Sequence, residues 1–145
     1  MSLNERALGI TTPATATIVE QGRIDALCDV VNDHNPAFRS GWRDGPALAP
    51  PTFINCFRDA KSQLVIDALG VDMPRLLHGE QTMTYHQPIR TGDLVFQQVA
   101  LVEVGQKATK AMGAAEFFKV WITLRNVHGQ LLAEAYQSFF VRSGS

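Results

Sequence analysis

The sequence has little cysteine and no long apolar run. Cys28 and Cys56 are the only cysteines in 145 residues, and they lack the CxxC spacing of redox or zinc sites. We interpret both as reduced residues that fill the interior. No uncharged apolar stretch approaches the ~20 residues that cross a bilayer, and the first residues lack the charged-then-apolar pattern of a secretory signal. These absences predict a cytoplasmic protein.

An excess of charge of either sign is also missing. The chain has 13 Lys and Arg against 14 Asp and Glu, a formal net charge of -1, without a basic stripe. This balance argues against nucleic acid as the main partner. Hydrophobic residues make up 46% of the sequence, enough for a packed core. The length fits one domain, which we place at residues 1–145.

The first third of the chain predicts a short strand, a helix and a loop. Residues 14–20 are rich in Thr, Ile and Val, which favours a strand. A helical spacing of three and four follows at Ile24, Leu27, Cys28 and Val31. Pro36 disfavours a helical Asn35, so the helix ends before it. Residues 38–51 are punctuated by Gly and Pro and are expected to form a loop.

A second and longer helix is predicted after this loop. It should begin near Thr52, whose hydroxyl can cap free amides, and end at Gly70. One face is apolar and consists of Phe53, Phe57, Ala60, Leu64 and Ala68. This stripe is nearly continuous, as expected for a helix wrapped by a sheet.

The second half of the chain has the period of two that is typical of strands. Four runs are recognised, over residues 82–86, 94–104, 118–124 and 131–139. In the second run, one face consists of Leu94, Phe96, Gln98, Ala100, Val102 and Val104. The turns at residues 91–93 and 127–130 are predicted to join neighbouring runs as antiparallel hairpins. Strands that follow helices in this order indicate an α+β fold.

Three segments together resemble the MaoC-like acyl dehydratase and hydratase family. They are residues 32–38 (NDHNPAF), 49–53 (APPTF) and 78–93 (HGEQ through YHQPIRTGD). The third is closest to the N-terminal, FAS1-like dehydratase branch, which includes non-catalytic subunits of heterodimeric dehydratases. The resemblance implies a single hot-dog domain, in which a curved antiparallel sheet wraps a long central helix. It covers almost the whole chain, and three motifs in the right order are more specific than any one of them.

The family's chemistry implies roles for the first segment. Hydration of an enoyl thioester needs a base on the water and stabilisation of the enolate oxygen. Asp33 matches the family's catalytic Asp, and Asn35 matches the Asn that shapes the loop. Phe38 occupies the position of the catalytic His, and a hydrocarbon ring cannot carry a proton. His34 is the nearest substitute as a catalytic residue, although its side chain should point elsewhere.

The other two segments supply candidate substrate-binding residues. Amides at the start of the central helix polarise the thioester carbonyl in the family, so Thr52, Phe53 and Asn55 are candidates here, with a simple capped helix as the alternative. Phe38 and Asn35 join this group. His86 either contacts substrate or is a half-buried residue bonded to a neighbouring carbonyl. His78 and Glu80 share a face of an extended segment without a third ligand, so we expect no metal there and a role at a dimer seam.

Three functions follow from these residues. The first is an enoyl-thioester hydratase or 3-hydroxyacyl dehydratase that uses Asp33. The second is a non-catalytic subunit whose partner hot-dog chain supplies Asp and His, with the chain forming a homodimer or a heterodimer. The third is a thioesterase, for which Asp59 and Asp67 are helix carboxylates. In each case the ligand is an acyl thioester of coenzyme A or of an acyl carrier protein, and no cofactor is expected.

Overall fold

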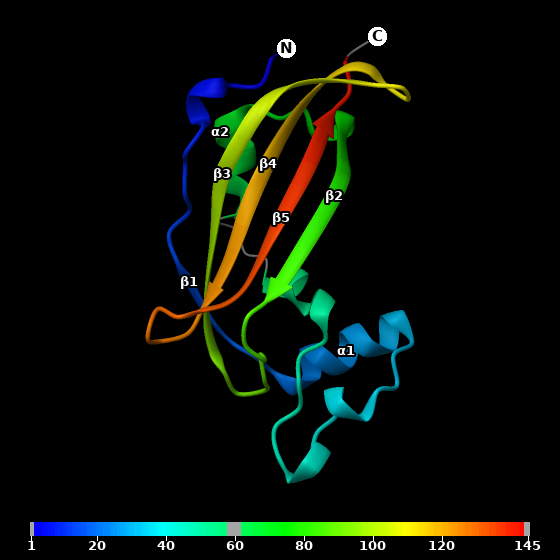
Figure 1. Ribbon diagram of the computed structural model, residues 1–145, viewed down its shortest axis with the longest axis vertical. Helices are drawn as coiled ribbons and strands as arrows, with labels where there is room; N and C mark the ends of the chain where they lie inside the picture. The colour runs from blue at the N-terminus through cyan, green and yellow to red at the C-terminus, as the bar shows by residue number, and fades with distance from the viewer. Residues whose placement is uncertain (1, 58–61, 144–145) are drawn as a thin grey trace.

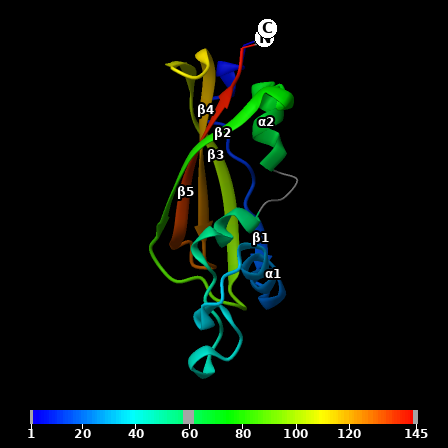
Figure 2. The ribbon, with the colours of Figure 1, turned by 90° about the vertical axis from the view of Figure 1, so that its right-hand side faces the viewer.

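One five-stranded antiparallel sheet dominates the structure (Figure 1). The computed structural model describes residues 2–57 and 62–143. The helices and strands are β1 (Thr15–Ile18), α1 (Gln21–Val31), α2 (Gln63–Leu69), β2 (Leu76–Tyr85), β3 (Leu94–Thr109), β4 (Gly113–Arg125) and β5 (Leu131–Val141). The curved sheet has α1 and α2 on the same side, near opposite ends of the strands (Figure 2). This α+β arrangement confirms the predicted fold class.

The strand order is β1-β3-β4-β5-β2, with every pairing antiparallel. The turn at residues 127–130 joins neighbouring strands β4 and β5, as predicted. The turn at residues 91–93 does not form a hairpin, and that prediction was wrong. Strands β2 and β3 lie on different parts of the sheet, because β2 pairs with β5 and β3 pairs with β1 and β4. Turn residues indicate where the chain changes direction. Which strands then pair depends on contacts between residues that are far apart in the sequence.

The helices cover the face of the sheet that contributes to the core. Along β3 this face is formed by Val95, Gln97, Val99 and Leu101, each 6% exposed or less. The alternate face that begins at Leu94 points away from the core, and Leu94 and Val102 are 37% and 40% exposed. The predicted runs on β4 and β5 do lie in the core, from Phe118 to Leu124 and from Ala133 to Phe139. A strand with apolar residues on both faces does not reveal its buried face by periodicity alone.

The predicted second helix is seen as two segments. Residues Pro51–Phe57 form a 3₁₀-helix, and the α-helical part is α2. Residues 58–61, including Ala60 and Asp59 of the predictions, lie outside the described residues. Phe53 and Phe57 are buried as predicted, but Leu64 is 46% exposed, and Val65 and Leu69 face the core instead. A 3₁₀-helix has three residues per turn, so a stripe projected at 3.6 residues per turn loses its phase.

The helix ends follow local chemistry. Asn32 ends α1 in the left-handed conformation, with φ 56° and ψ 44°, and Gly70 ends α2 in the same way. In α1, Ile24 and Cys28 are fully buried, but Val31 is 55% exposed at the last turn. The two thiols are free; Cys28 is buried and Cys56 is half-buried, and desolvation raises the pKa of both. Both observations support the packing role.

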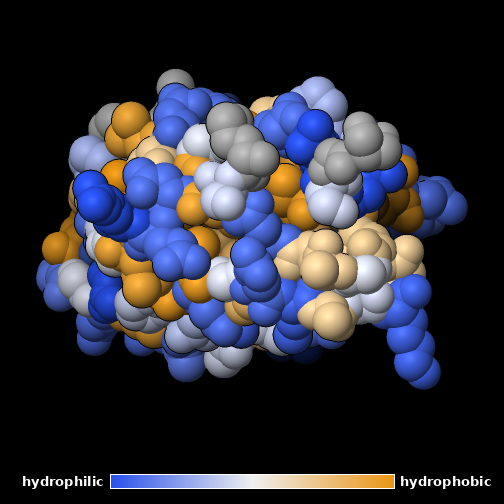
Figure 3. Space-filling model, turned by 90° about the horizontal axis from the view of Figure 1, so that it is seen from above, coloured by the Kyte–Doolittle hydropathy of each residue, from blue (hydrophilic) through white to orange (hydrophobic). Residues whose placement is uncertain are grey.

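The two termini lie at the same end of the molecule (Figure 1). Hydrophobic and hydrophilic side chains are interspersed over most of this end (Figure 3). Among residues 2–57 and 62–143, no helix combines the length and the apolarity needed to span a membrane.

Candidate functional site

The loop after α1 is shaped by its own polar side chains. Asp33 Oδ1 accepts a hydrogen bond from the Asn35 N–H at 2.9 Å, and Asn35 Oδ1 accepts one from the Ala37 N–H at 3.0 Å. His34 lies outside, with its Nε2 2.8 Å from Asn32 Oδ1. These are the local turns that Asp and Asn favour, because their short side chains reach the backbone two residues ahead.

Arg39 ties this loop to α1. Its guanidinium lies 3.2 Å from Asp25 Oδ1 and 3.4 Å from Asp29 Oδ1, and it donates to the Asp33 carbonyl at 3.4 Å. Gln21 adds a second tie, donating to the Phe38 carbonyl at 3.0 Å. The position of Phe38 is therefore held by polar contacts to its backbone and to its neighbour.

Phe38 contributes to an open apolar groove of about 410 Å³. The other lining residues are Leu48, Ala49, Pro51, Tyr85, His86, Gln87, Pro88 and Ile89. The groove thus brings together two predicted site residues, Phe38 and His86, beside the start of the 3₁₀-helix. Asp33, His34 and Asn35 are not among its lining residues. Phe38, which was predicted to occupy the position of the family's catalytic His, therefore faces a mainly hydrocarbon surface.

The start of the 3₁₀-helix offers few free amide donors. The Phe53 N–H already donates to the Pro50 carbonyl at 2.9 Å, and Phe53 itself is buried. Thr52 is exposed, and its hydroxyl makes no hydrogen bond within residues 2–57 and 62–143, so the predicted side-chain cap is absent. The Tyr85 hydroxyl donates to the Pro51 carbonyl, and burial raises the pKa of Tyr85 to about 12. Tyr85 therefore stays protonated at neutral pH.

Asn55 joins the 3₁₀-helix to the sheet through its side-chain amide. Asn55 Oδ1 accepts from Gln81 Nε2 at 2.8 Å and from Gln137 Nε2 at 3.1 Å. Gln81 lies on the edge strand β2, and Gln137 lies beside it on β5. Asn55 was predicted as a site residue from the sequence, but neither glutamine was. The signal was present in Gln137, a polar residue in a strand run that is otherwise apolar.

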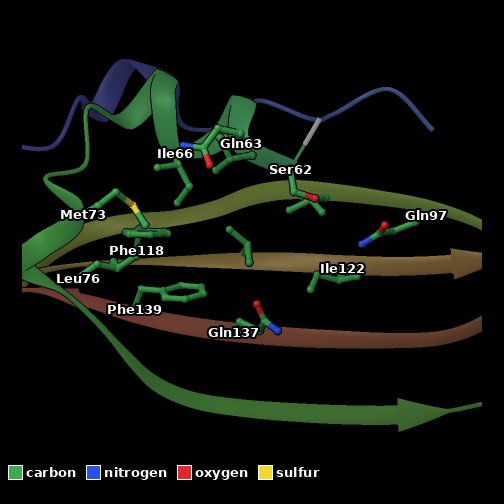
Figure 4. A pocket seen from close by; sticks show the side chains of 13 residues that line it. Ser62, Gln63, Ile66, Met73, Leu76, Gln97, Phe118, Ile122, Gln137 and Phe139 are labelled. Carbon is green, nitrogen blue, oxygen red and sulfur yellow. The ribbon is translucent and has the colours of Figure 1, made fainter. Parts of the chain in front are cut away.

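A second cavity, of about 200 Å³, lies between α2 and the core face of the sheet (Figure 4). Its apolar lining includes Ile66 and Met73 on the helix side and Phe118 and Phe139 on the strands. Ser62, Gln63, Gln97 and Gln137 add polar groups. None of these was predicted as a site residue, because α2, β3, β4 and β5 come together only in the folded sheet.

His86 points to the other face of the sheet from this cavity. Its Nε2 is 2.7 Å from Glu134 Oε2, and Glu134 Oε1 accepts from Trp121 Nε1 at 3.1 Å. The hydrogen bond from His86, followed by that from Trp121, lowers the pKa of Glu134 against the effect of desolvation. The partner of His86 is thus a carboxylate and not the backbone carbonyl of the alternative interpretation.

A bulge separates His78 from Glu80. The register of β2 against β5 shifts between His78 and Gln81. His78 packs edge-to-face against the buried Phe139, with ring centroids 4.9 Å apart. Glu80 instead lines a surface hollow with Lys119 on the outer face. The prediction that His78 and Glu80 share a face was wrong, because the extra residue of a bulge reverses the alternation.

Comparison with protein-family models shows to which family the chain belongs. The model of the FAS1-like, dehydratase domain region matches residues 6–135. The chain belongs to this FAS1-like dehydratase family. A UPF0336 protein of Streptomyces coelicolor is 34% identical over 103 residues, covering 64% of this chain and 67% of that protein. A UPF0336 protein of Saccharopolyspora erythraea is 28% identical and covers 98% of this chain and 93% of its own length.

Two solved dehydratase structures share the hot-dog fold of this chain. The C-terminally truncated HadBC (3R-hydroxyacyl-ACP dehydratase) complex of Mycobacterium tuberculosis superposes with a TM-score of 0.77 at 18% identity, over 92% of this chain and 96% of that one. A MaoC-like dehydratase superposes with a TM-score of 0.80, also at 18% identity. This superposition covers 97% of this chain but only 43% of the MaoC-like dehydratase chain. The dehydratase chain is therefore more than twice as long as its matched part. The predicted hot-dog fold is therefore confirmed.

Proposed function

We propose that this FAS1-like chain binds acyl thioesters of coenzyme A or of an acyl carrier protein, as one subunit of a hydratase or dehydratase. In this proposal a second hot-dog chain supplies the catalytic Asp and His. The observation that carries the proposal is that Phe38, the residue predicted at the family's His position, faces an apolar groove. A general base or acid must hold a proton within hydrogen-bond reach of the substrate, and Phe38 cannot do so.

The state of Asp33 also supports the subunit proposal. One carboxylate oxygen already accepts the Asn35 N–H, and the side chain is not part of the groove that contains Phe38. His34 is exposed and bonded to Asn32. The family's catalytic pair is thus represented by an Asp engaged in its own loop, with a substitute His that is bonded elsewhere.

The groove and the 3₁₀-helix suit substrate binding. We assign the apolar part of the thioester arm to the groove beside Phe38, where Leu48 and Ile89 also lie. Because the Phe53 amide is occupied, the Thr52 N–H and the Asn55 amide group are the donors assigned to the thioester carbonyl. A seven-residue 3₁₀-helix supplies only a small dipole, so these individual donors would dominate.

The edge of the sheet supports the expectation of a second chain. Strand β2 pairs on one side only, with β5, and runs for ten residues without proline. Leu77 and Met83 on this strand are each 37% exposed. Long unprotected edges are normally covered, because they offer free backbone N–H and C=O groups for pairing. We propose that β2 pairs with the matching strand of a partner, as in the dimer-seam expectation for residues 78–81.

Other relatives fit an assembly of two such units. The HadBC structure is described as a complex, and the MaoC-like dehydratase chain has room for a second unit of this size. A homodimer of this chain would hold two sites that lack His, whereas a heterodimer could hold one complete site. These considerations favour the heterodimer.

The thioesterase alternative receives no support from the described carboxylates. Asp67 is exposed and accepts a hydrogen bond from Gln63 on the same helix at 3.1 Å. It therefore faces solvent and not the sheet. Asp59 lies outside the described residues.

The test is hydration of a trans-2-enoyl-CoA by the purified chain alone, followed as loss of enoyl absorbance. Asp33→Asn is measured beside it, with Asp29→Asn as a matched control. Asp29 is an exposed carboxylate on α1 that also pairs with Arg39. Binding of a saturated acyl-CoA, which cannot be hydrated, is measured by calorimetry on the same samples.

The proposal predicts acyl-CoA binding without turnover by the chain alone, and turnover when a hot-dog chain with both Asp and His is added. Turnover by the chain alone that disappears in Asp33→Asn but persists in Asp29→Asn would overturn it and establish an autonomous hydratase. Release of free thiol from a saturated acyl-CoA would instead establish a thioesterase.

A further inference from the structure

The side chain of Gln97 is a polar group placed among core residues. This residue is 5% exposed and lies on β3, on the core face of the sheet. Its amide points into the cavity between α2 and the sheet (Figure 4). Among residues 2–57 and 62–143, no residue forms a hydrogen bond with this amide, and its nitrogen and oxygen remain accessible from the cavity. A ligand that filled the cavity and left this amide without a partner would bind less favourably by about 1–3 kcal/mol.

Gln137 places a second amide in the same cavity. It is 6% exposed, and its Nε2 donates to Asn55 Oδ1. Gln97 pairs with Leu124 on β4, whereas Gln137 pairs with Val120, four residues away along the same strand. Four residues of strand span about 13 Å. The cavity floor is therefore apolar between two side-chain amides. That of Gln137 is hydrogen-bonded to Asn55, and that of Gln97 has no hydrogen bond within the described residues.

The remaining lining defines the ligand that these groups fit. The other strand residues of the cavity are apolar, and none of its lining residues within 2–57 and 62–143 carries a charge. A carboxylate or an ammonium group would be buried there without a counterion from these residues, which is strongly unfavourable. A hydroxyl or keto oxygen needs only a hydrogen bond, and a primary amide offers both donors and an acceptor.

The volume of the cavity fits the end of an acyl chain and not a whole coenzyme. The cavity holds about 200 Å³. At ~30 Å³ for each water-sized group, this is space for roughly six or seven carbon or oxygen atoms. Such a tail would contact both the apolar floor and the open amide.

We infer that this cavity recognises an acyl chain that carries a neutral oxygen function, a hydroxyl or keto group, through Gln97. The inference rests on the proposed acyl-thioester function and adds a substrate class to it. Gln97 would act as a specificity-determining residue, since a hydrogen-bonding site rejects a ligand that leaves its buried polar group unpaired. An unmodified alkyl chain would leave the Gln97 amide in that state.

The experiment measures calorimetric affinities of the full chain for decanoyl-CoA and for a series of monohydroxydecanoyl-CoA isomers with the hydroxyl at successive carbons from C5 to C10. The expected result is that at least one isomer binds 10- to 100-fold more tightly than decanoyl-CoA. In Gln97→Leu, that preference should disappear, while the affinity for decanoyl-CoA is kept or improved.

Gln98→Leu is the matched control. Gln98 is the next residue on β3, and its Nε2 donates to the Thr12 carbonyl at 3.1 Å on the other face of the strand. This variant should keep the preference for the hydroxylated isomer. Circular dichroism and thermal melts of both variants establish that they are folded.

The outcomes separate the inference from the proposed function. Equal affinity for decanoyl-CoA and all the hydroxylated isomers, unchanged in Gln97→Leu, would overturn the inference. Acyl-thioester binding would remain intact, and the partner of the Gln97 amide would be water. Absence of binding for every acyl-CoA would overturn the proposed function itself. A preference that Gln98→Leu abolishes as fully as Gln97→Leu would also refute the assignment to Gln97.

Discussion

Gly79 on the edge strand is the position where one added methyl group should be most damaging. A Cβ at residue 79 would lie 2.6 Å from Phe140 Cε2 and 3.1 Å from the Ser138 carbonyl oxygen. The first distance is about 1 Å shorter than the ~3.5 Å of a favourable carbon contact. The backbone oxygen limits how far the strand can retreat, so the Phe140 ring must move.

The expected cost of Gly79→Ala follows from overpacking, which destabilises proteins by about 1–3 kcal/mol. For a chain of this length, a loss of ~2 kcal/mol corresponds to a fall in Tm of roughly 4–8 °C. Thermal and urea unfolding at a fixed protein concentration give both values, since any dimer would make Tm depend on concentration.

Two further variants test whether the clash with Phe140 causes the loss of stability. Gly22→Ala is the matched control, because a Cβ in that first turn of α1 meets nothing within 4 Å. It should stabilise the chain by about 0.5–1 kcal/mol. Phe140→Leu removes the ring that Gly79→Ala strikes, so the double variant should lose less stability than the two single losses together. A Gly79→Ala protein as stable as the wild type, or strict additivity with Phe140→Leu, would refute the proposed clash.

Two other predictions concern the polar clusters. Asn55→Ala removes the acceptor shared by Gln81 and Gln137, and the half-buried and buried amides left unpaired should cost about 1–3 kcal/mol in urea unfolding. Asn55→Asp keeps the acceptor oxygen and should lose less, so equal losses in the two variants would contradict this explanation. Glu134→Gln weakens the contact with His86 and should cost about 0.5–1.5 kcal/mol at neutral pH. Because the pKa of Glu134 is lowered in the folded protein, its contribution is present above the ordinary value of 4.5 and is lost as the pH falls through the lowered value. The stability difference between wild type and Glu134→Gln should therefore shrink in acid, and a difference that grows there would show that the ionised carboxylate is not the stabilising form.

Much of the local structure was determined by the sequence alone. The helical spacing in α1 and the alternation in β4 and β5 predicted elements that the structure contains, because side-chain direction repeats with the local backbone period. Gly70 marked a helix end because a left-handed residue is needed there. The three family motifs predicted the hot-dog fold, and the similar solved structures confirm it.

Tertiary structure decided which elements meet, and with them the candidate site. Strand β2 pairs with β5 and not with β3, which no turn residue could reveal, because strand pairing joins residues far apart in the chain. The bulge after His78 separated it from Glu80. Gln97 became a binding candidate only when α2 came to lie over the sheet and formed a cavity with it, since hydrogen-bond satisfaction is a property of the assembled surroundings and not of any residue type.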